Sequence, residues 1–402
     1  MLRCNSKRML QAAHSSSSRT LLTAIAGAVA MAVAMGFGRF FYTPVLPSMM
    51  EGLGLSAADA GFIAAANFAG YLAGAVLAAY GWAAGIERRV AIAALAANAL
   101  LLLAMGLSGT VAAFSVIRFL AGLSSAFAMI FTSGIVLSHG LRAGDVRVQM
   151  LHFSGVGSGI ALSSLVVYLI SHEGWGGFAG WRVDWFAAAA LAVLGLAAVH
   201  LLLPAEGASS AEGREPRLQW TRLLAGLTLS YGLFGVGYVV TATFIVAIAR
   251  HGGHDPLLEC LTWLVTGIAA ALSLRLWKGA ERRLSTLGAY VLALLLEAAG
   301  VAATVVLPAP WSALTGGLLL GMTVMVITAY GLQLGRQMAP DSPRRILAMM
   351  TAAFGVGQIV GPLMAGWLAE RSGSYTLPSL IAAAILIAAA LICLAVRPAR
   401  AG

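Results

Sequence analysis

Long apolar stretches separated by short polar gaps run along almost the whole chain. About twelve of them reach the roughly 20 residues that an α-helix needs to cross the hydrocarbon layer of a membrane. The pattern therefore predicts an all-α polytopic membrane protein with twelve transmembrane helices. The predicted spans cover residues 24–48, 58–81, 89–108, 110–137, 148–170, 181–203, 222–249, 258–277, 284–307, 310–334, 345–369 and 376–396.

The composition agrees with this class. The 402 residues are 60% hydrophobic and only 10% charged, which excludes an ordinary soluble domain. The three cysteines, Cys4, Cys260 and Cys393, lie far apart and lack the spacing of metal ligands. We therefore expect no metal site and no cofactor.

Positive charge is distributed unevenly among the gaps. Most of the 25 Lys and Arg residues lie in the N-terminal tail and in every second gap, whereas the opposite gaps contain only Arg182, Arg250 and Arg371. Because cytoplasmic loops carry the excess of Lys and Arg, both termini are predicted to be cytoplasmic, in a bacterial inner (cytoplasmic) membrane. This distribution accounts for the net charge of +10 without a nucleic-acid partner.

One longer polar run, residues 204–219, divides the spans into six and six. Its Gly, Ser, Glu and Arg content is typical of a solvated linker. The predicted organisation is a cytoplasmic tail, an N-terminal six-helix bundle, a cytoplasmic linker and a C-terminal six-helix bundle. The predicted bounds of these four parts are residues 1–20, 21–203, 204–220 and 221–402.

The two halves also share short glycine patterns at an offset of about 200 residues, which indicates a duplicated unit. Gly155-Val156-Gly157 in the fifth span matches Gly355-Val356-Gly357 in the eleventh, and Gly36-Phe37-Gly38 in the first matches Gly235-Val236-Gly237 in the seventh.

Several segments resemble motifs of the major facilitator superfamily. They are Arg118-Phe-Leu-Ala-Gly122, Gly357-Gln-Ile-Val-Gly361-Pro362 and Gly180-Trp181-Arg182, while the segment from Gly36 to Pro47 resembles the YbfB/YjiJ group more particularly. The resemblance implies two pseudo-symmetric six-helix bundles around a central substrate site. It also implies a secondary transporter that works as a monomer by alternating access, driven by an ion gradient, with protons favoured.

The loop between the second and third spans departs from the pattern of this superfamily. It reads Gly81-Trp-Ala-Ala-Gly85-Ile-Glu87-Arg88-Arg89, without the Asp that precedes the basic pair in the usual motif. The gating salt bridge that the family motif implies therefore has Glu87 as its only acidic candidate here.

Three strongly charged side chains lie well inside predicted spans: Arg39, Arg118 and Glu297. Such groups are costly in a membrane and mark functional sites. Arg39 and Arg118 both lie about 12–14 Å below the outer surface, given 1.5 Å of rise per residue. They are candidates for binding an anionic group, and Arg118 also for proton coupling; alternatively each snorkels outward or caps carbonyls of a neighbouring helix.

Glu297 lies in the middle of the ninth span, where an isolated carboxylate is unfavourable. We expect it to be neutral or paired with a cation. Proton coupling is one role open to it, and an inter-helix hydrogen bond is the other.

Further polar side chains in the spans are candidates for substrate binding or for hydrogen bonds between helices. These are Tyr42, Asn67, Tyr238, Thr241 and Gln358. His152, about one turn inside the fifth span, is expected to face a loop. Close helix contacts and half-to-half gating are expected at Gly155, Gly157, Gly159, Gly357, Gly361 and Pro362.

Enzyme signatures are missing from the sequence. It has no zinc-protease His-Glu-x-x-His motif, no paired intramembrane aspartates and no phosphate-binding Gly-x-x-x-x-Gly-Lys-[Ser/Thr] loop. We therefore predict a proton-coupled transporter of a small anionic or amphiphilic organic solute. Proton-driven multidrug efflux and a transport-inactive membrane sensor are the alternatives.

Overall fold

A computed structural model describes residues 20–145, 147–170, 177–204, 216–253 and 255–395. These described residues are predominantly helical and contain no β-strand. They include 12 helical segments that are long and apolar enough to cross a membrane. The prediction of an all-α protein with twelve spans is confirmed.

The first span, Thr20–Leu53, is divided into separate helical segments. Residues 20–31 are α-helical, η1 (Ala32–Phe37) is π-helical, residues 38–41 form a turn, and α2 (Tyr42–Leu53) completes the span. The remaining helices are α3 (Ala57–Ala78), α4 (Glu87–Leu107), α5 (Val111–Ala143), α6 (Arg147–Ile170), α7 (Gly180–Leu202), α8 (Arg222–His251), α9 (Pro256–Leu276), α10 (Lys278–Val306), α11 (Trp311–Met338), α12 (Pro343–Ser372) and α13 (Thr376–Ala395). The span of α10 also contains a kink, at Ser285, whose backbone is non-helical (φ 67°).

Short polar signals set several helix ends. Ser56 and Asp59 form a capping box at the start of α3, each side chain accepting a hydrogen bond of 3.1 Å from the backbone N–H of the other. Thr110 and Thr221 cap α5 and α8 in the same general way. Gly54 ends α2 in the left-handed conformation (φ 64°), which glycine adopts without steric cost.

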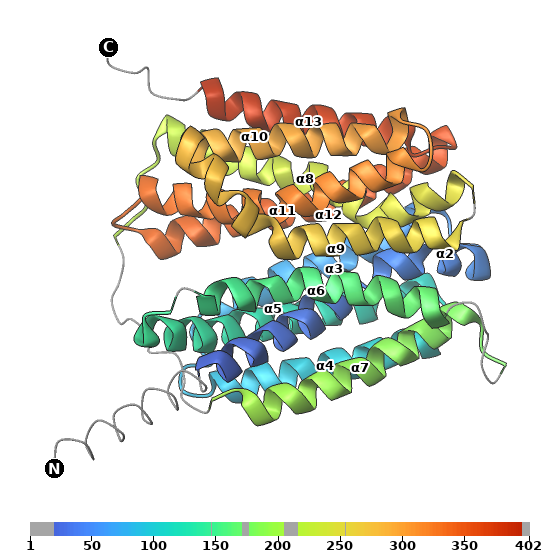
Figure 1. Cartoon of the computed structure of the whole chain (residues 1–402), viewed down its shortest axis with the longest axis horizontal. Coiled ribbons are helices and arrows are strands. Elements are labelled where there is room, and N and C mark those ends of the chain that lie inside the picture. Colours follow the sequence, from blue (N-terminus) through green and yellow to red (C-terminus); the bar gives the residue numbers. More distant parts are fainter. Residues whose placement is uncertain (1–19, 146, 171–176, 205–215, 254, 396–402) are drawn as a thin grey trace, which may run out of the picture.

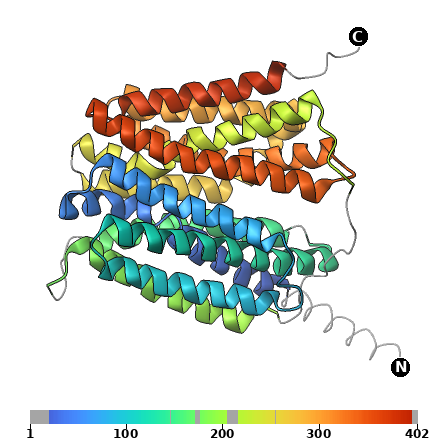
Figure 2. The same cartoon turned by 180° about the vertical axis from the view of Figure 1, so that it is seen from behind.

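The helices form two groups, shown from opposite sides in Figures 1 and 2. The first half of the chain (blue to green) lies below the second (yellow-green to red) in Figure 1, and the halves meet where α3 packs on α12 and α6 packs on α9. We call the end where α2 passes into α3 the distal end, and the opposite end, where the described part of the first span begins and α13 ends, the terminal end. The predicted tail, except Thr20, and most of the predicted linker lie outside the described residues; Thr20 begins the first span.

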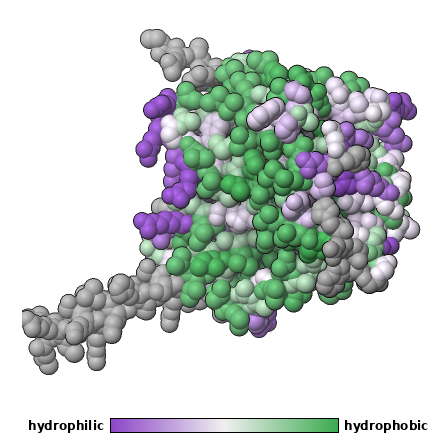
Figure 3. Space-filling model, turned by 45° about the vertical axis from the view of Figure 1, so that its right-hand side comes forward, coloured by the Kyte–Doolittle hydropathy of each residue, from purple (hydrophilic) through white to green (hydrophobic). Residues whose placement is uncertain are grey.

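The surface suits a lipid environment. Figure 3 shows hydrophobic side chains across the middle of the molecule, with hydrophilic side chains gathered toward its ends. Leu100, Leu194 and Leu391 are each more than half exposed. A continuous exposed apolar surface of this kind is covered by lipid in a membrane protein. Which side of the membrane each end faces stays a prediction.

Candidate functional site

Arg39 lies in the turn at residues 38–41, between η1 and α2, which we call the joint of the first span. Pro44 has no N–H for the Phe40 carbonyl, which accepts from the Thr43 N–H at 3.2 Å. The carbonyls of Gly38 and Arg39 accept hydrogen bonds from Arg118, at 3.0 Å from Nη1 and 2.7 Å from Nη2. Arg118 therefore fastens α5 to the open backbone of the joint.

Arg118 is 2% exposed, and its guanidinium carbon lies 5.2 Å from the centre of the Tyr42 ring. Only its Nε lacks a hydrogen-bond partner. Among the roles considered for Arg118, which are anion binding, proton coupling, snorkelling and capping, the capping of neighbouring carbonyls matches these contacts.

Arg39 has a very different environment. It is 4% exposed, and its guanidinium carbon lies 5.4, 4.8 and 4.2 Å from the ring centres of Phe40, Phe68 and Tyr71. Its Nε and Nη2 have no hydrogen-bond partner, and none of the described carboxylates forms an ion pair with it. A buried cation with free donors is unfavourable unless it is paired.

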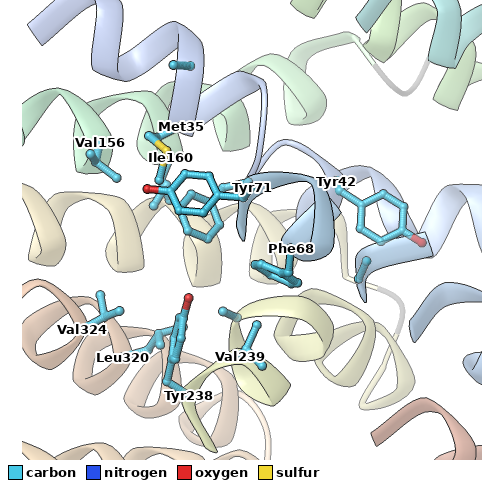
Figure 4. Close-up of a cluster of buried hydrophobic side chains, with 14 of the residues drawn as sticks. Met35, Tyr42, Phe68, Tyr71, Val156, Ile160, Tyr238, Val239, Leu320 and Val324 are labelled. Atoms are coloured by element: carbon cyan, nitrogen blue, oxygen red, sulfur yellow. The ribbon is translucent and has the colours of Figure 1, made fainter. Parts of the chain in front are cut away.

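Tyr238 of α8 and Gln358 of α12 approach Arg39 from the other half of the molecule. We call the surface where the two halves meet the seam. Figure 4 shows Tyr238 extending across it, toward Phe68 and Tyr71 of the N-terminal half. Tyr238 interacts electrostatically with Arg39 and Tyr71, and its hydroxyl accepts a hydrogen bond from Nε2 of Gln358. The structure thus brings together three of the predicted binding residues: Arg39, Tyr238 and Gln358.

The other predicted binding residues make contacts between helices or have no partner. The Tyr42 hydroxyl donates to the Ala60 carbonyl at 3.1 Å, and Nδ2 of Asn67 donates to the Arg118 carbonyl at 2.9 Å. Oδ1 of Asn67 and the buried hydroxyl of Thr241 have no hydrogen-bond partner. Tyr42 and Asn67 therefore hold α2 and α5 against α3.

Glu297 is fully buried in α10 and contacts the Thr323 hydroxyl of α11. Thr323 also donates to the Leu319 carbonyl at 2.6 Å. Oε1 of Glu297 has no partner, and none of the described cations forms an ion pair with this carboxyl group. Tyr238 interacts electrostatically with Glu297 as well as with Arg39.

His152 corrects the sequence analysis. The expected loop-facing imidazole is wrong, because the side chain is completely buried and its Nε2 lies 2.8 Å from the Ser133 hydroxyl. Gly27 of the first span leaves room for the ring, since a Cβ there would meet Nδ1. The histidine therefore packs inside the N-terminal half.

The distal end contains polar contacts between the two halves. Nε and Nη2 of Arg250 each lie 2.7 Å from the Glu259 carboxylate, and Nη1 lies 3.0 Å from Glu51 of α2. The Thr43 hydroxyl donates to the Ala242 carbonyl at 2.7 Å. Glu51, Arg250 and Glu259 also line a cavity of about 280 Å³.

Comparison with known proteins identifies the family. A family model described as "Uncharacterised MFS-type transporter YbfB" matches residues 31–394. The chain belongs to this family of the major facilitator superfamily (MFS). No curated protein matches the chain.

Solved structures with the same fold include two transporters. A mutant of the nucleoside transporter NupG has a TM-score of 0.76 at 15% identity, covering 94% of this chain and 99% of that one. A bacterial homologue of the human lysosomal transporter Spinster, inward-facing and unoccupied, has a TM-score of 0.72 at 14% identity, covering 96% and 99%. At these identities the likeness shows the fold. The chain is thus an integral membrane transporter of the MFS type, and its family is one of transporters, not enzymes.

Gly157 and Pro362 lie where the halves of this MFS transporter meet. A Cβ at Gly157 would meet the backbone of Gly267 on α9, and the Pro362 carbonyl would meet a Cβ at Gly61 on α3. Close backbone approach of this kind needs glycine. The other predicted packing glycines lie against helices of their own half instead: Gly155 and Gly159 against the first span, and Gly357 and Gly361 against α8.

Glu87 and Arg88, the acidic and basic residues expected in the motif between the second and third spans, are the first residues of α4. Arg88 donates from Nε to the Leu203 carbonyl at 3.0 Å and from Nη2 to the His200 carbonyl at 2.6 Å. Oε2 of Glu87 is buried without a partner. Arg88 therefore caps the end of α7.

Sequence reasoning missed the aromatic side chains around Arg39 and the contacts of Arg250. A signal existed for the former, because Asn67, Phe68 and Tyr71 are three and four residues apart and share one face of α3. The Arg250–Glu51 contact joins residues 199 apart in the sequence, and the Arg250–Glu259 contact joins the end of one helix to the start of the next, so neither follows a helical spacing.

Proposed function

We propose that this transporter moves a small organic anion across the membrane as a secondary transporter, by alternating access. The observation that supports this most strongly is Arg39, a buried cation with two free N–H donors and no carboxylate partner in the described part of the chain. Desolvating such a charge costs several kcal/mol unless it is paired. A ligand that brings the missing negative charge therefore gains affinity and specificity at this position.

The contacts of the distal end support alternating access. Arg250–Glu51 and Thr43–Ala242 link the two halves there, so the distal end is closed in this conformation. We propose that these contacts separate when the transporter opens to the distal side. With cytoplasmic termini, as the charge pattern predicts, that side is the outside of the cell.

Proton coupling is proposed at Glu297. The Thr323 hydroxyl has one hydrogen and lies within donating reach of both the Glu297 carboxyl group and the Leu319 carbonyl. A protonated Glu297 can donate to this hydroxyl while Thr323 donates to Leu319, so both contacts are satisfied when the carboxyl group carries a proton. Loss of that proton would add a negative charge near Tyr238, which also interacts with Arg39. A deprotonated Glu297 and a bound anion would thus disfavour each other, which couples their binding.

The test uses purified protein in proteoliposomes. We expect uptake of labelled organic anions driven by a proton gradient, and exchange of the same anions without a gradient. Arg39→Ala should abolish both activities, whereas Arg336→Ala, which removes an exposed arginine of α11, should change neither. Glu297→Gln should abolish gradient-driven accumulation and retain exchange.

Two results would contradict the proposal. Anion transport that is unchanged in Arg39→Ala would remove Arg39 from the site. Transport of lipophilic cations, indifferent to Arg39→Ala, would favour multidrug efflux, which the aromatic surroundings also fit.

A further inference from the structure

The two free nitrogens of Arg39 lie on a single edge of its guanidinium group. Nε–H and one N–H of Nη2 are parallel, and this fork matches the two oxygens of a planar carboxylate. Arg118 lacks such an edge, because its Nη1 and Nη2 bond backbone carbonyls. Arg39 therefore offers the complete carboxylate-binding fork.

Flat aromatic faces surround this fork on the N-terminal half. The guanidinium carbon lies 4.2 Å from the Tyr71 ring centre and 4.8 Å from that of Phe68. Both rings belong to α3, one turn apart, and both are buried. A ligand held by Arg39 therefore meets ring surfaces immediately beside its carboxylate.

Tyr238, which interacts electrostatically with Arg39, belongs to a stack of rings in the C-terminal half. Tyr238 and Phe354 are nearly parallel, with an interplanar angle of 4° and ring centres 5.6 Å apart. Phe234 stacks on both, with ring centres 5.0 Å from Tyr238 and 5.4 Å from Phe354. Tyr238 accepts a hydrogen bond from Gln358, while its own O–H has no acceptor among the described residues. This O–H is a further donor toward a carboxylate.

We propose that the substrate is a planar aromatic monocarboxylate. Its two oxygens bond the Nε–Nη2 edge of Arg39, and its ring stacks between the aromatic side chains of α3 and those of α8 and α12. The proposal rests on the proposed function and narrows it. A single carboxylate is specified because Arg118, the other buried arginine here, uses both Nη groups on the joint.

The test compares four probes by thermal shift of the detergent-purified full chain. Benzoate should stabilise the protein by mass action, whereas benzamide, which has the ring without the charge, should not. Cyclohexanecarboxylate, with the same charge and a non-planar ring, should bind about two- to tenfold more weakly, since an aromatic pair contributes about 0.5–1.5 kcal/mol beyond its buried area. Terephthalate should bind more weakly than benzoate, because its second carboxylate has no cation to pair with.

Variants locate the site. Arg39→Lys keeps the charge and loses the fork, so benzoate affinity should fall about tenfold or more. Tyr71→Leu should remove the preference for benzoate over cyclohexanecarboxylate, and Tyr71→Phe, which keeps the ring, should retain it. Phe127→Leu is the matched control, because that ring packs on Trp82 and Phe131.

The outcomes separate this inference from the proposed function. If cyclohexanecarboxylate binds as tightly as benzoate and Arg39→Ala abolishes both, the aromatic specificity is overturned while anion transport through Arg39 stands. If neither benzoate nor the longer probe cinnamate stabilises the wild-type protein, the aromatic class is also overturned. If benzoate binds equally well to wild type and Arg39→Ala, both proposals fail.

Discussion

Two regions of the seam between the halves use arginine in opposite ways. At the distal end, the Arg250 side chain is 18% exposed and has two carboxylate partners, Glu259 of its own half and Glu51 of the other. In the middle of the seam, Arg39 is more deeply buried and is surrounded by aromatic rings, with no carboxylate pairing among the described residues. The first arrangement is complete within the protein, and the second fits the anionic ligand that we propose.

The energies suit these two roles. The Glu51 side chain is 57% exposed, so its ion pair with Arg250 contributes only about 0.2–1 kcal/mol. A contact this weak can close the distal end and still break in each cycle. A carboxylate bound to the fork of Arg39, shielded from water, gains about 1.5–3 kcal/mol from each charged hydrogen bond.

The largest expected effect comes from giving Arg39 a carboxylate partner within the protein, as Arg250 has. Phe68→Glu places a carboxylate beside the guanidinium group, where the ring centre is now 4.8 Å away. This internal partner should displace the substrate and reduce anion affinity by at least about 100-fold, the equivalent of two charged hydrogen bonds. Isothermal titration or thermal shift with the transported anion measures it.

Phe68→Gln is the matched control, since it has the same shape as Glu and no charge. It should lose only the contribution of the ring. If Phe68→Glu and Phe68→Gln bind the anion equally, the missing carboxylate is not what makes Arg39 a binding residue.

A smaller effect is expected where the halves touch through backbone. Gly157→Ala adds a Cβ that meets the backbone of Gly267 and Ala271 on α9, which cannot move away as a side chain can. Overpacking of about 1–3 kcal/mol should disfavour the distal-closed conformation and slow exchange about tenfold. Anion binding at Arg39 should change less than the exchange rate.

Gly279→Ala is the control, because a Cβ at Gly279 meets no atom within 4 Å. Exchange rates measured in proteoliposomes should be normal in this variant. Normal exchange in Gly157→Ala as well would mean that the α6–α9 contact does not control the cycle.

The sequence predicts the spans well because hydropathy reports directly on lipid contact. It also finds both buried arginines, since a charge inside a span is conspicuous. It does not separate their roles, because Arg118 reaches carbonyls 79 and 80 residues away that are free only where the first span is jointed. The prediction that His152 faces a loop is wrong for a related reason. Its burial depends on Ser133 of α5 and on the space left by Gly27, which are distant in the sequence.

The smallest expected effect tests the distal contact itself, with a native cysteine as reporter. Cys260 is 7% exposed, lines the distal cavity and offers its carbonyl to the Ser164 hydroxyl across the seam at 2.6 Å. In a protein carrying Cys4→Ser and Cys393→Ala, Cys260 is the only thiol, and a maleimide reaches it faster when the distal end opens.

Glu51→Gln in this background removes the charge that links Arg250 to the first half and leaves the Arg250–Glu259 pair intact. An exposed ion pair of about 0.2–1 kcal/mol predicts a labelling rate raised by up to about fivefold. Glu281→Gln, which neutralises a carboxylate at the terminal end, should leave the rate unchanged.

A saturating anion that binds Arg39 should alter the labelling rate if the two regions are coupled, because α2 joins the turn beside Arg39 to Glu51. A rate indifferent to both Glu51→Gln and the anion would show that the Arg250 contact neither closes the distal end nor responds to the binding site.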